Sequence, residues 1–281
     1  MKIKNSMQLK ALIKKKAVEK KISPQLVMQN YMLERLLERI SLSKYSHNFI
    51  LKGGYLISSI VGLETRTTMD LDTTIKGFTL THDSVSNIFK EICDIEVKDN
   101  IQFEMINIYD ICEGDRYPGI RVALKANYAP ISVPINVDIT TGDVITPKEI
   151  EYSFQSLFDE RKINILAYSI ETVLAEKIET ILSREVANTR LRDFYDIYVL
   201  YRLYDSDFDI NMLKLALIST MKKRESVHLL DNYSEIIENI HKDKKLQNLW
   251  IKYQQKFNYA NDISFDNICN TIQYILDMIM K

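Results

Sequence analysis

The uneven placement of glycine and proline constrains the fold of this chain more than any other feature. All seven glycines lie between Gly53 and Gly142, and four of the five prolines lie between Pro118 and Pro147. Residues 148–281 contain neither type. Because glycine and proline mark turns, we predict a turn-rich sheet in the first half of the chain and a largely helical second half.

Short β-branched or alternating runs predict the strands of a mixed sheet. They lie at residues 48–51, 68–75, 101–109, 120–127 and 133–140. Between the second and third runs, apolar residues recur at helical spacing over residues 83–93 and predict a crossing helix. Ser23 followed by Pro24 is a typical start of an N-terminal helix.

Helical patterns continue through the second half. Ser169 is placed to cap a helix, a second helix is expected from about Thr189 to Tyr204, and an apolar stripe predicts a third at residues 268–280. The expected class is α+β, with a mixed sheet and flanking helices followed by a helical bundle. The expected domains are an α/β domain with basic N-terminal helices at residues 1–150 and a helical domain at residues 151–281.

Composition excludes several classes of protein. The 281 residues are 46% hydrophobic and 27% charged, which is typical of a globular protein and not of a disordered or fibrous one. Three cysteines without a CxxC spacing (Cys93, Cys112 and Cys269) indicate neither a disulfide framework nor a zinc site. No apolar run approaches the roughly 20 residues that cross a bilayer, and the N-terminus lacks the apolar stretch of a secretory leader. We therefore expect a cytoplasmic protein without a membrane partner.

Charge is balanced over the whole chain but not along it. The formal net charge is -1, whereas residues 1–52 carry a net charge of +9. Clustered lysines attract a phosphate backbone because pairing with nucleic acid releases counterions. The same lysines also fit a solvated helix face, and the sequence leaves both interpretations open.

A glycine pair follows the first predicted strand. In Lys52-Gly53-Gly54-Tyr55, the pair stands between an apolar strand and a helical run. Such a turn lets the backbone approach a phosphate, and the helix N-terminus presents free N–H groups to it. A purely structural turn has the same pattern.

Two aspartates alternate on the next predicted strand. Residues two apart on a strand point to the same face, so Asp70 and Asp72 project together. Paired carboxylates repel one another unless a cation lies between them, and hard oxygen ligands suit Mg²⁺. The alternative is a solvent-facing pair at a strand end.

A later strand carries a third carboxylate. Asn136, Asp138 and Thr140 alternate with apolar residues. If this strand lies beside the one with Asp70 and Asp72, the three carboxylates share a face and suit two metal ions roughly 3.5–4 Å apart.

The helical half carries a further charged pattern. Lys177 lies in Ala175-Glu176-Lys177-Ile178, and Arg190 precedes Asp193 and Asp196, which share a helix face at i and i+3. Taken alone, these residues also fit a surface ladder of ion pairs.

Together these motifs resemble the polymerase-β nucleotidyltransferase superfamily and, within it, the AbiEii family that includes the MenT toxins. The resemblance spans about residues 49–203. It implies a toxin of a toxin–antitoxin or phage-defence system, paired with an AbiEi-like antitoxin. It also implies Mg²⁺-dependent transfer of nucleotides from an NTP, a pyrimidine NTP in the MenT toxins, to the 3′ acceptor end of tRNA, which blocks translation.

The resemblance also implies residue roles. Asp70 and Asp72 would bind Mg²⁺, Asp138 matches the third carboxylate, Lys177 would contact the triphosphate and Asp193 would lie in the catalytic cleft. The nucleotide-binding set would be Lys52, Gly53, Gly54, Tyr55, Thr68, Arg190 and Asp196. Two positions depart from the family pattern, because Tyr55 stands where Thr or Ser is usual and Arg192 replaces the commoner Lys.

Two other functions stay open at this stage. A related enzyme could transfer the nucleotide to a hydroxyl of a protein or a small molecule. A non-catalytic scaffold could instead bind a partner such as an antitoxin, although the intact acidic positions argue against it.

Overall fold

The computed structural model describes residues 3–111, 119–204 and 208–281. The chain divides into two compact units, of which the first contains residues 1–143 and 150–167 and the second contains residues 144–149 and 168–281. The first unit is built on a seven-stranded mixed sheet and the second on helices. The predicted α+β class is confirmed.

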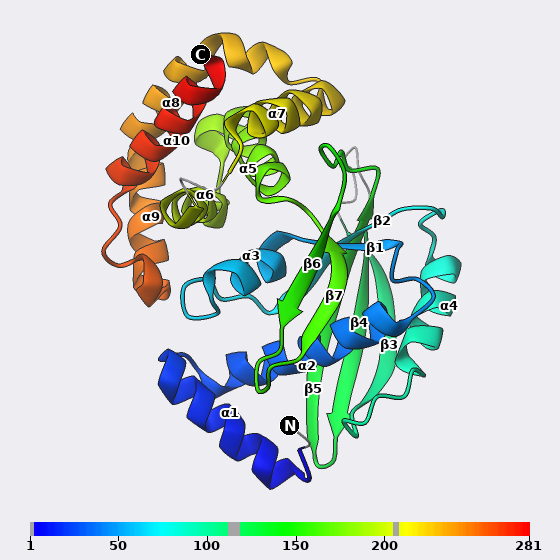
Figure 1. The fold of residues 1–281 in the computed structure, drawn as a ribbon. Helices are drawn as coiled ribbons and strands as arrows, with labels where there is room; N and C mark the ends of the chain where they lie inside the picture. The colour runs from blue at the N-terminus through cyan, green and yellow to red at the C-terminus, as the bar shows by residue number, and fades with distance from the viewer. Residues whose placement is uncertain (1–2, 112–118, 205–207) are drawn as a thin grey trace. The chain divides into compact units, whose positions relative to one another are not determined.

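The sheet has the strand order β3-β4-β5-β2-β1-β7-β6 (Figure 1). Only the pairs β2–β5 and β1–β7 are parallel, and the other neighbours are antiparallel. The strands are β1 (Phe49–Lys52), β2 (Asp70–Ile75), β3 (Gln102–Ile111), β4 (Gly119–Tyr128), β5 (Ile131–Thr141), β6 (Ile150–Gln155) and β7 (Lys162–Ala167). All five predicted strands are therefore present, with ends shifted by one or two residues.

Among the described residues of this unit, four α-helices accompany the sheet, namely α1 (Ser6–Lys20), α2 (Pro24–Leu42), α3 (Gly53–Val61) and α4 (His82–Cys93). The predicted start of α2 is confirmed, because Ser23 Oγ accepts a hydrogen bond from the Leu26 N–H at 3.2 Å. This helix lies across the sheet and packs on β5 and β7 (Figure 1). The sheet side chains that form the core, including Leu71, Val137 and Ile139, are fully buried.

Strands β6 and β7 depart from the helical second half that the sequence predicts. Alternating side chains explain them, since Phe154, Ile163 and Ile165 are buried while Ser153, Gln155, Lys162 and Asn164 are exposed. Their connection, residues 156–161, contains no glycine or proline, and the Ser156 N–H donates to the Arg161 carbonyl at 2.9 Å. Residues 150–167 thus belong to the sheet unit and not to the expected helical domain.

The second unit contains six α-helices among its described residues, which are α5 (Ile170–Arg184), α6 (Leu191–Tyr204), α7 (Ile210–Arg224), α8 (Tyr233–Lys242), α9 (Lys244–Lys256) and α10 (Phe265–Met280). Ser169 caps α5 as predicted, with its Oγ accepting from the Thr172 N–H at 3.2 Å. Trp250 and Phe194 are among the buried aromatic side chains of this unit. In the described part of the chain, no helix has the length and apolarity needed to span a membrane.

Candidate active site

Four charged side chains stand opposite one another across four adjacent strands. Lys52 of β1 faces Asp72 of β2, Asp72 faces Asp138 of β5, and Asp138 faces Arg121 of β4. Directly opposed residues share a face of the sheet, with their Cβ atoms about 5 Å apart. We call Lys52, Asp72, Asp138 and Arg121 the charged row. The register confirms that the strand with Asp138 lies beside the strand with the two aspartates.

Asp70 lies on the same face, two residues before Asp72. It is opposite Asn136 in the register, and the Asn136 Nδ2 donates to Asp70 Oδ1 at 3.2 Å. Leu71, between the two aspartates, is fully buried on the other face. The predicted alternation is thus confirmed, and it presents two carboxylates together at the start of β2.

The glycine pair lies directly against the carboxylate of Asp72. The Gly54 N–H donates to Asp72 Oδ2 at 2.9 Å, and Gly53 has a φ of +63°. A Cβ on Gly53 would lie 2.3 Å from the same carboxylate oxygen, so only glycine allows this close approach. Burial raises the pKa of Asp72, the charge of Asp138 adds to that rise, and the hydrogen bond from Gly54 opposes it.

Gly54 is closely surrounded by side chains of the following segment. A Cβ there would lie 3.0 Å from both Arg66 Nη2 and Thr68 Oγ1. Arg66 is buried with only 4% of its surface exposed, and its positive charge acts on Asp72. No role for Arg66 is expected from the sequence, whereas the structure places its guanidinium group against the glycine turn. Thr68 is also buried, and its Oγ1 donates to the Asp70 carbonyl at 3.4 Å.

The two cations of the charged row have different partners. Arg121 Nε and Nη2 donate to Asp138 Oδ1 and Oδ2 at 2.6 and 2.7 Å, and this bidentate hydrogen bond raises the pKa of Arg121. Lys52 Nζ instead bonds Asp143 Oδ2 at 2.6 Å. Burial opposes ionisation of Asp143, but the charge and hydrogen bond of Lys52 together with hydroxyl donors lower its pKa.

Like Arg66, Arg121 and Asp143 are site residues that sequence reasoning missed. Arg121 occupies a polar-face position in an alternating strand, which is a signal that could have found it. Asp143 follows Gly142 in a loop after β5, and its Oδ2 also accepts from Thr140 Oγ1 at 2.7 Å. Only the folded chain shows that this loop carboxylate neutralises Lys52.

The carboxylates fit a single divalent cation better than two. Among the described residues, no group of three or more His, Cys, Asp or Glu side chains is arranged to hold a metal ion. Asp70 and Asp72 offer two oxygen ligands on one face, which suits Mg²⁺ because waters and substrate phosphates usually complete its coordination. Both oxygens of Asp138, by contrast, accept hydrogen bonds from Arg121.

Tyr55 does not direct its side chain toward the carboxylates. Only 2% of Tyr55 is exposed, its ring stacks on Phe154 with 5.4 Å between ring centroids, and its hydroxyl donates to the Asn30 carbonyl at 3.2 Å. The expected nucleotide contact at this position is therefore limited to the backbone of the turn.

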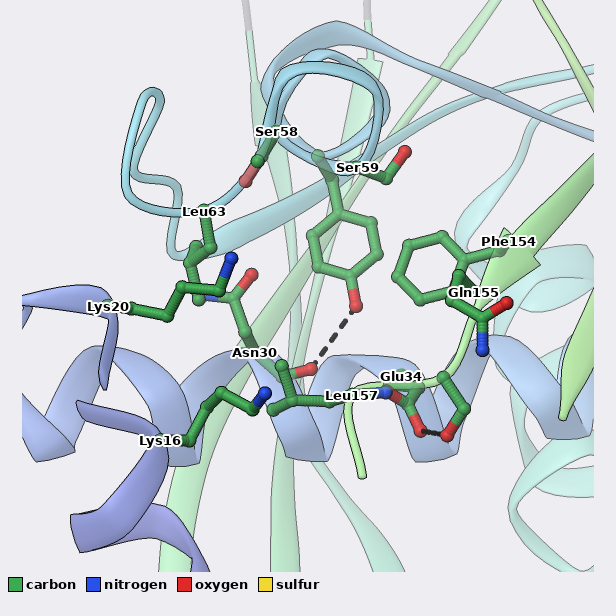
Figure 2. A pocket seen from close by; sticks show the side chains of 13 residues that line it. Lys16, Lys20, Asn30, Glu34, Ser58, Ser59, Leu63, Phe154, Gln155 and Leu157 are labelled. Carbon is green, nitrogen blue, oxygen red and sulfur yellow. Dashed lines mark hydrogen bonds between the residues drawn. The ribbon is translucent and has the colours of Figure 1, made fainter. Parts of the chain in front are cut away.

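Tyr55 lines a cavity of about 220 Å³ between α1, α2, α3 and the end of β6, which Figure 2 shows. Lys16 and Lys20 reach the edge of this cavity (Figure 2). Each lysine is paired with a carboxylate, Lys16 with Glu19 at 3.0 Å and Lys20 with Glu64 at 2.5 Å. The cavity therefore lacks the strong excess of positive charge that marks an anion site.

The second unit holds its own charged cluster. Lys177 of α5 contacts Asp193 at 2.6 Å and Asp196 at 2.8 Å, both on α6. Asp196 is fully buried and Lys177 has 13% of its side chain exposed. The predicted shared face of Asp193 and Asp196 is confirmed. We call Lys177, Asp193 and Asp196 the lysine cluster.

The remaining predicted residue of this unit lies outside the lysine cluster. Arg190 is exposed and immediately precedes α6, where its N–H donates to Asn188 Oδ1 at 2.8 Å. Arg192 is also exposed, and its guanidinium group lies over the ring of Phe257.

Comparison with solved structures finds proteins of similar fold. The structure is similar to that of JHP933 from Helicobacter pylori (15% identity, 92% of this chain and 91% of the other, TM-score 0.53). It is also similar to MenT4, a nucleotidyltransferase toxin from Mycobacterium tuberculosis (14% identity, 96% of this chain and 98% of the other, TM-score 0.54). These likenesses concern the fold. Among curated proteins, no significant match is found.

A family model covers most of the chain. The model of the nucleotidyl transferase AbiEii toxin, type IV toxin–antitoxin system, matches residues 35–271. The matched range includes the glycine turn, the charged row and the lysine cluster. The chain belongs to the AbiEii family of nucleotidyltransferase toxins.

Proposed function

We propose that this protein transfers nucleotides from an NTP to the 3′ acceptor end of tRNA in a Mg²⁺-dependent reaction, and thereby blocks translation. The observation that carries the proposal is the placement of Asp70 and Asp72 beside the backbone N–H groups of the Gly53–Gly54 turn. This combination can hold a metal-bound triphosphate, because the N-terminus of a helix favours phosphate and paired carboxylates favour Mg²⁺.

The glycine turn and the aspartates would divide the work of binding. Backbone N–H groups in the first turn of α3, other than that of Gly54, which donates to Asp72, would bind phosphate oxygens, and Asp70 and Asp72 would hold Mg²⁺. When bound, Mg²⁺ supplies charge neutralisation and orientation of the phosphates for in-line displacement. Lys52 and Arg66 add positive charge close to the same turn.

Asp138 would position the attacking hydroxyl. Each carboxylate oxygen has a second lone pair, so Asp138 can accept a hydrogen bond from an RNA 3′-hydroxyl while it remains bound to Arg121. The 3′-oxygen forms a bond to the α-phosphorus, the bond from that phosphorus to pyrophosphate breaks, and the hydroxyl proton passes to Asp138 or to solvent. Such a reaction depends mainly on positioning and charge neutralisation.

The lysine cluster would act on the departing group. We propose that Lys177 binds the leaving pyrophosphate, and that Asp193 and Asp196 hold its ammonium group in position until then. Arg190, which is exposed, would support nucleotide binding.

Helix α1 would guide the RNA. Its exposed surface carries Lys10, Lys14 and Lys15, and exposed Lys21 follows its last turn. A basic surface of this kind binds a phosphate backbone with a strong dependence on salt concentration. We further propose a pyrimidine NTP as substrate and an AbiEi-like antitoxin as partner in a cytoplasmic phage-defence system.

The decisive experiment incubates the purified protein with total tRNA, Mg²⁺ and each α-labelled NTP separately. Labelled RNA is then resolved on a denaturing gel. The variant Asp70→Ala removes one proposed metal ligand, and Asp83→Asn is a matched control that removes an exposed carboxylate of the same unit. We expect label in tRNA with the wild type and with Asp83→Asn but not with Asp70→Ala.

Other outcomes would replace the proposal. Label in protein or in small molecules, with none in tRNA, would assign a different acceptor hydroxyl. Failure of the wild type to bind Mg²⁺ and NTP would favour a non-catalytic scaffold that binds a partner.

A further inference from the structure

The pairing of Arg121 with Asp138 is fixed by the sheet. The two residues are directly opposed in the antiparallel register of β4 and β5, and two hydrogen bonds at 2.6 and 2.7 Å join both carboxylate oxygens to the guanidinium group. Only 18% of the Asp138 side chain is exposed. A bidentate arginine pair of this geometry is both strong and specific in direction.

This pairing resolves an electrostatic conflict within the charged row. Asp72 and Asp138 are directly opposed, and like charges in that position destabilise a sheet. The carboxylates of Asp70 and Asp72 also act on Arg121, so its positive charge serves the whole group of three. Arginine does not lose its proton in proteins, and this cation is therefore permanent.

A second metal ion would need the oxygens that Arg121 already occupies. A site with two metal ions holds them roughly 3.5–4 Å apart between shared carboxylates. Both oxygens of Asp138 already bond Arg121, so a divalent ion there would have to share the carboxylate with a guanidinium group of the same sign or displace it. The geometry thus favours competition between Arg121 and a second metal ion.

We propose that Arg121 takes the place of a second metal ion at Asp138, so that the site binds one divalent ion at Asp70 and Asp72. This inference rests on the proposed metal-dependent reaction and names the cation that would complete its charge balance. Arg121 is a positioning residue in this account, because it acts through Asp138.

The test is a titration of the full-length protein with Mn²⁺, in which free Mn²⁺ is measured by electron paramagnetic resonance. We expect one bound ion per chain in the wild type and two in Arg121→Gln, since the substitution frees both oxygens of Asp138. The matched control is Lys125→Gln, which removes an exposed positive charge from the same strand and should leave one bound ion. Thermal melting followed by circular dichroism verifies that each variant is folded.

A second arm does not depend on the folding of the Arg121 variant. Asp138→Asn should change the Mn²⁺ dissociation constant less than about threefold, because Asp138 is not a metal ligand in this account. Asp72→Asn should weaken binding at least about tenfold, as the loss of a ligand requires.

The outcomes separate this inference from the proposed reaction. Two ions in the wild type, one ion in folded Arg121→Gln, or a tenfold loss of affinity in Asp138→Asn would each overturn the role of Arg121 and leave metal-dependent transfer intact. No Mn²⁺ binding by the wild type would overturn both.

Discussion

The charged row of the sheet and the lysine cluster of the helical unit use the same residue types in opposite ways. In the charged row, Asp72 and Asp138 are directly opposed carboxylates, and the hydrogen bonds of Arg121 reach Asp138 but not Asp72. In the lysine cluster, one ammonium group contacts both carboxylates. The first arrangement costs stability unless a cation binds, whereas the second stabilises its unit internally.

This contrast teaches that a charged pair in sequence does not by itself define a site. Asp70 and Asp72 on a strand and Asp193 and Asp196 on a helix are equally conspicuous as patterns. What distinguishes them is how the neighbouring elements pair with them. Asp72 lies between Lys52 of β1 and another carboxylate, Asp138 of β5, and Lys52 bonds Asp143. Lys177 of α5, by contrast, contacts both carboxylates of its pair directly.

The largest expected effect concerns stability of the helical unit. Lys177→Gln removes the ammonium group that contacts the fully buried carboxylate of Asp196, and breaking a buried pair in this way costs about 3–5 kcal/mol. Unfolding in urea measures the loss. The double variant Lys177→Gln with Asp196→Asn should recover much of it, and a double variant no more stable than the single one would contradict the pairing account.

The next effect concerns activity of the sheet unit. Gly53→Ala places a Cβ in the position of the Asp72 carboxylate and should reduce nucleotide transfer at least about 100-fold. Gly77→Ala is the matched control, because its φ of +91° gives similar backbone strain, but its Cβ would meet Asn48 instead of a carboxylate of the site. Both variants should melt at a lower temperature than the wild type. Equal nucleotide-transfer activities of the two variants would show that Gly53 has no specific role in the site.

A smaller effect links stability to pH in the absence of divalent ions. The pKa of Asp72 is raised in the folded protein, so the native state binds a proton more tightly than the unfolded chain and its stability falls as pH rises through this range. Asp72→Asn removes this dependence while its amide oxygen can still accept from Gly54. The variant should match the wild type near pH 4 and melt about 2–4 °C higher at neutral pH.

Asp143 should give the opposite dependence of stability on pH. Its pKa is lowered, so it contributes stability above the ordinary carboxyl pKa and loses that contribution as pH falls. Asp143→Asn should therefore destabilise the protein most at neutral pH. Melting curves of the two variants from pH 4 to pH 8 should diverge, and parallel curves would contradict the assigned directions.

The smallest effect concerns Tyr55, which stands where Thr or Ser is usual in the family pattern. Tyr55→Phe removes one hydrogen bond to the Asn30 carbonyl and should cost about 1 kcal/mol of stability. The KM for NTP should stay within about threefold, because the side chain lines the cavity of Figure 2 and only the backbone belongs to the turn. A large rise in the KM for NTP with unchanged stability would instead indicate that the Tyr55 side chain contacts the nucleotide.

Much of the fold is predictable because local patterns carry it. Ser23 and Ser169 cap helices as expected, and alternation along β2 and β5 fixes which residues share the polar face. Strands β6 and β7 are missed because their hairpin connection contains no glycine or proline. Alternating burial still marks them as strands.

The sequence by itself determined the carboxylates of Asp70 and Asp72, the glycine turn and the shared helix face of Asp193 and Asp196, because residue spacing sets side-chain direction within one element. The tertiary structure decided their partners. Strand register placed Arg121 on Asp138, a loop brought Asp143 to Lys52, and helix packing brought Lys177 to Asp196. These contacts join distant residues, and only long-range pairing of strands and helices can specify them.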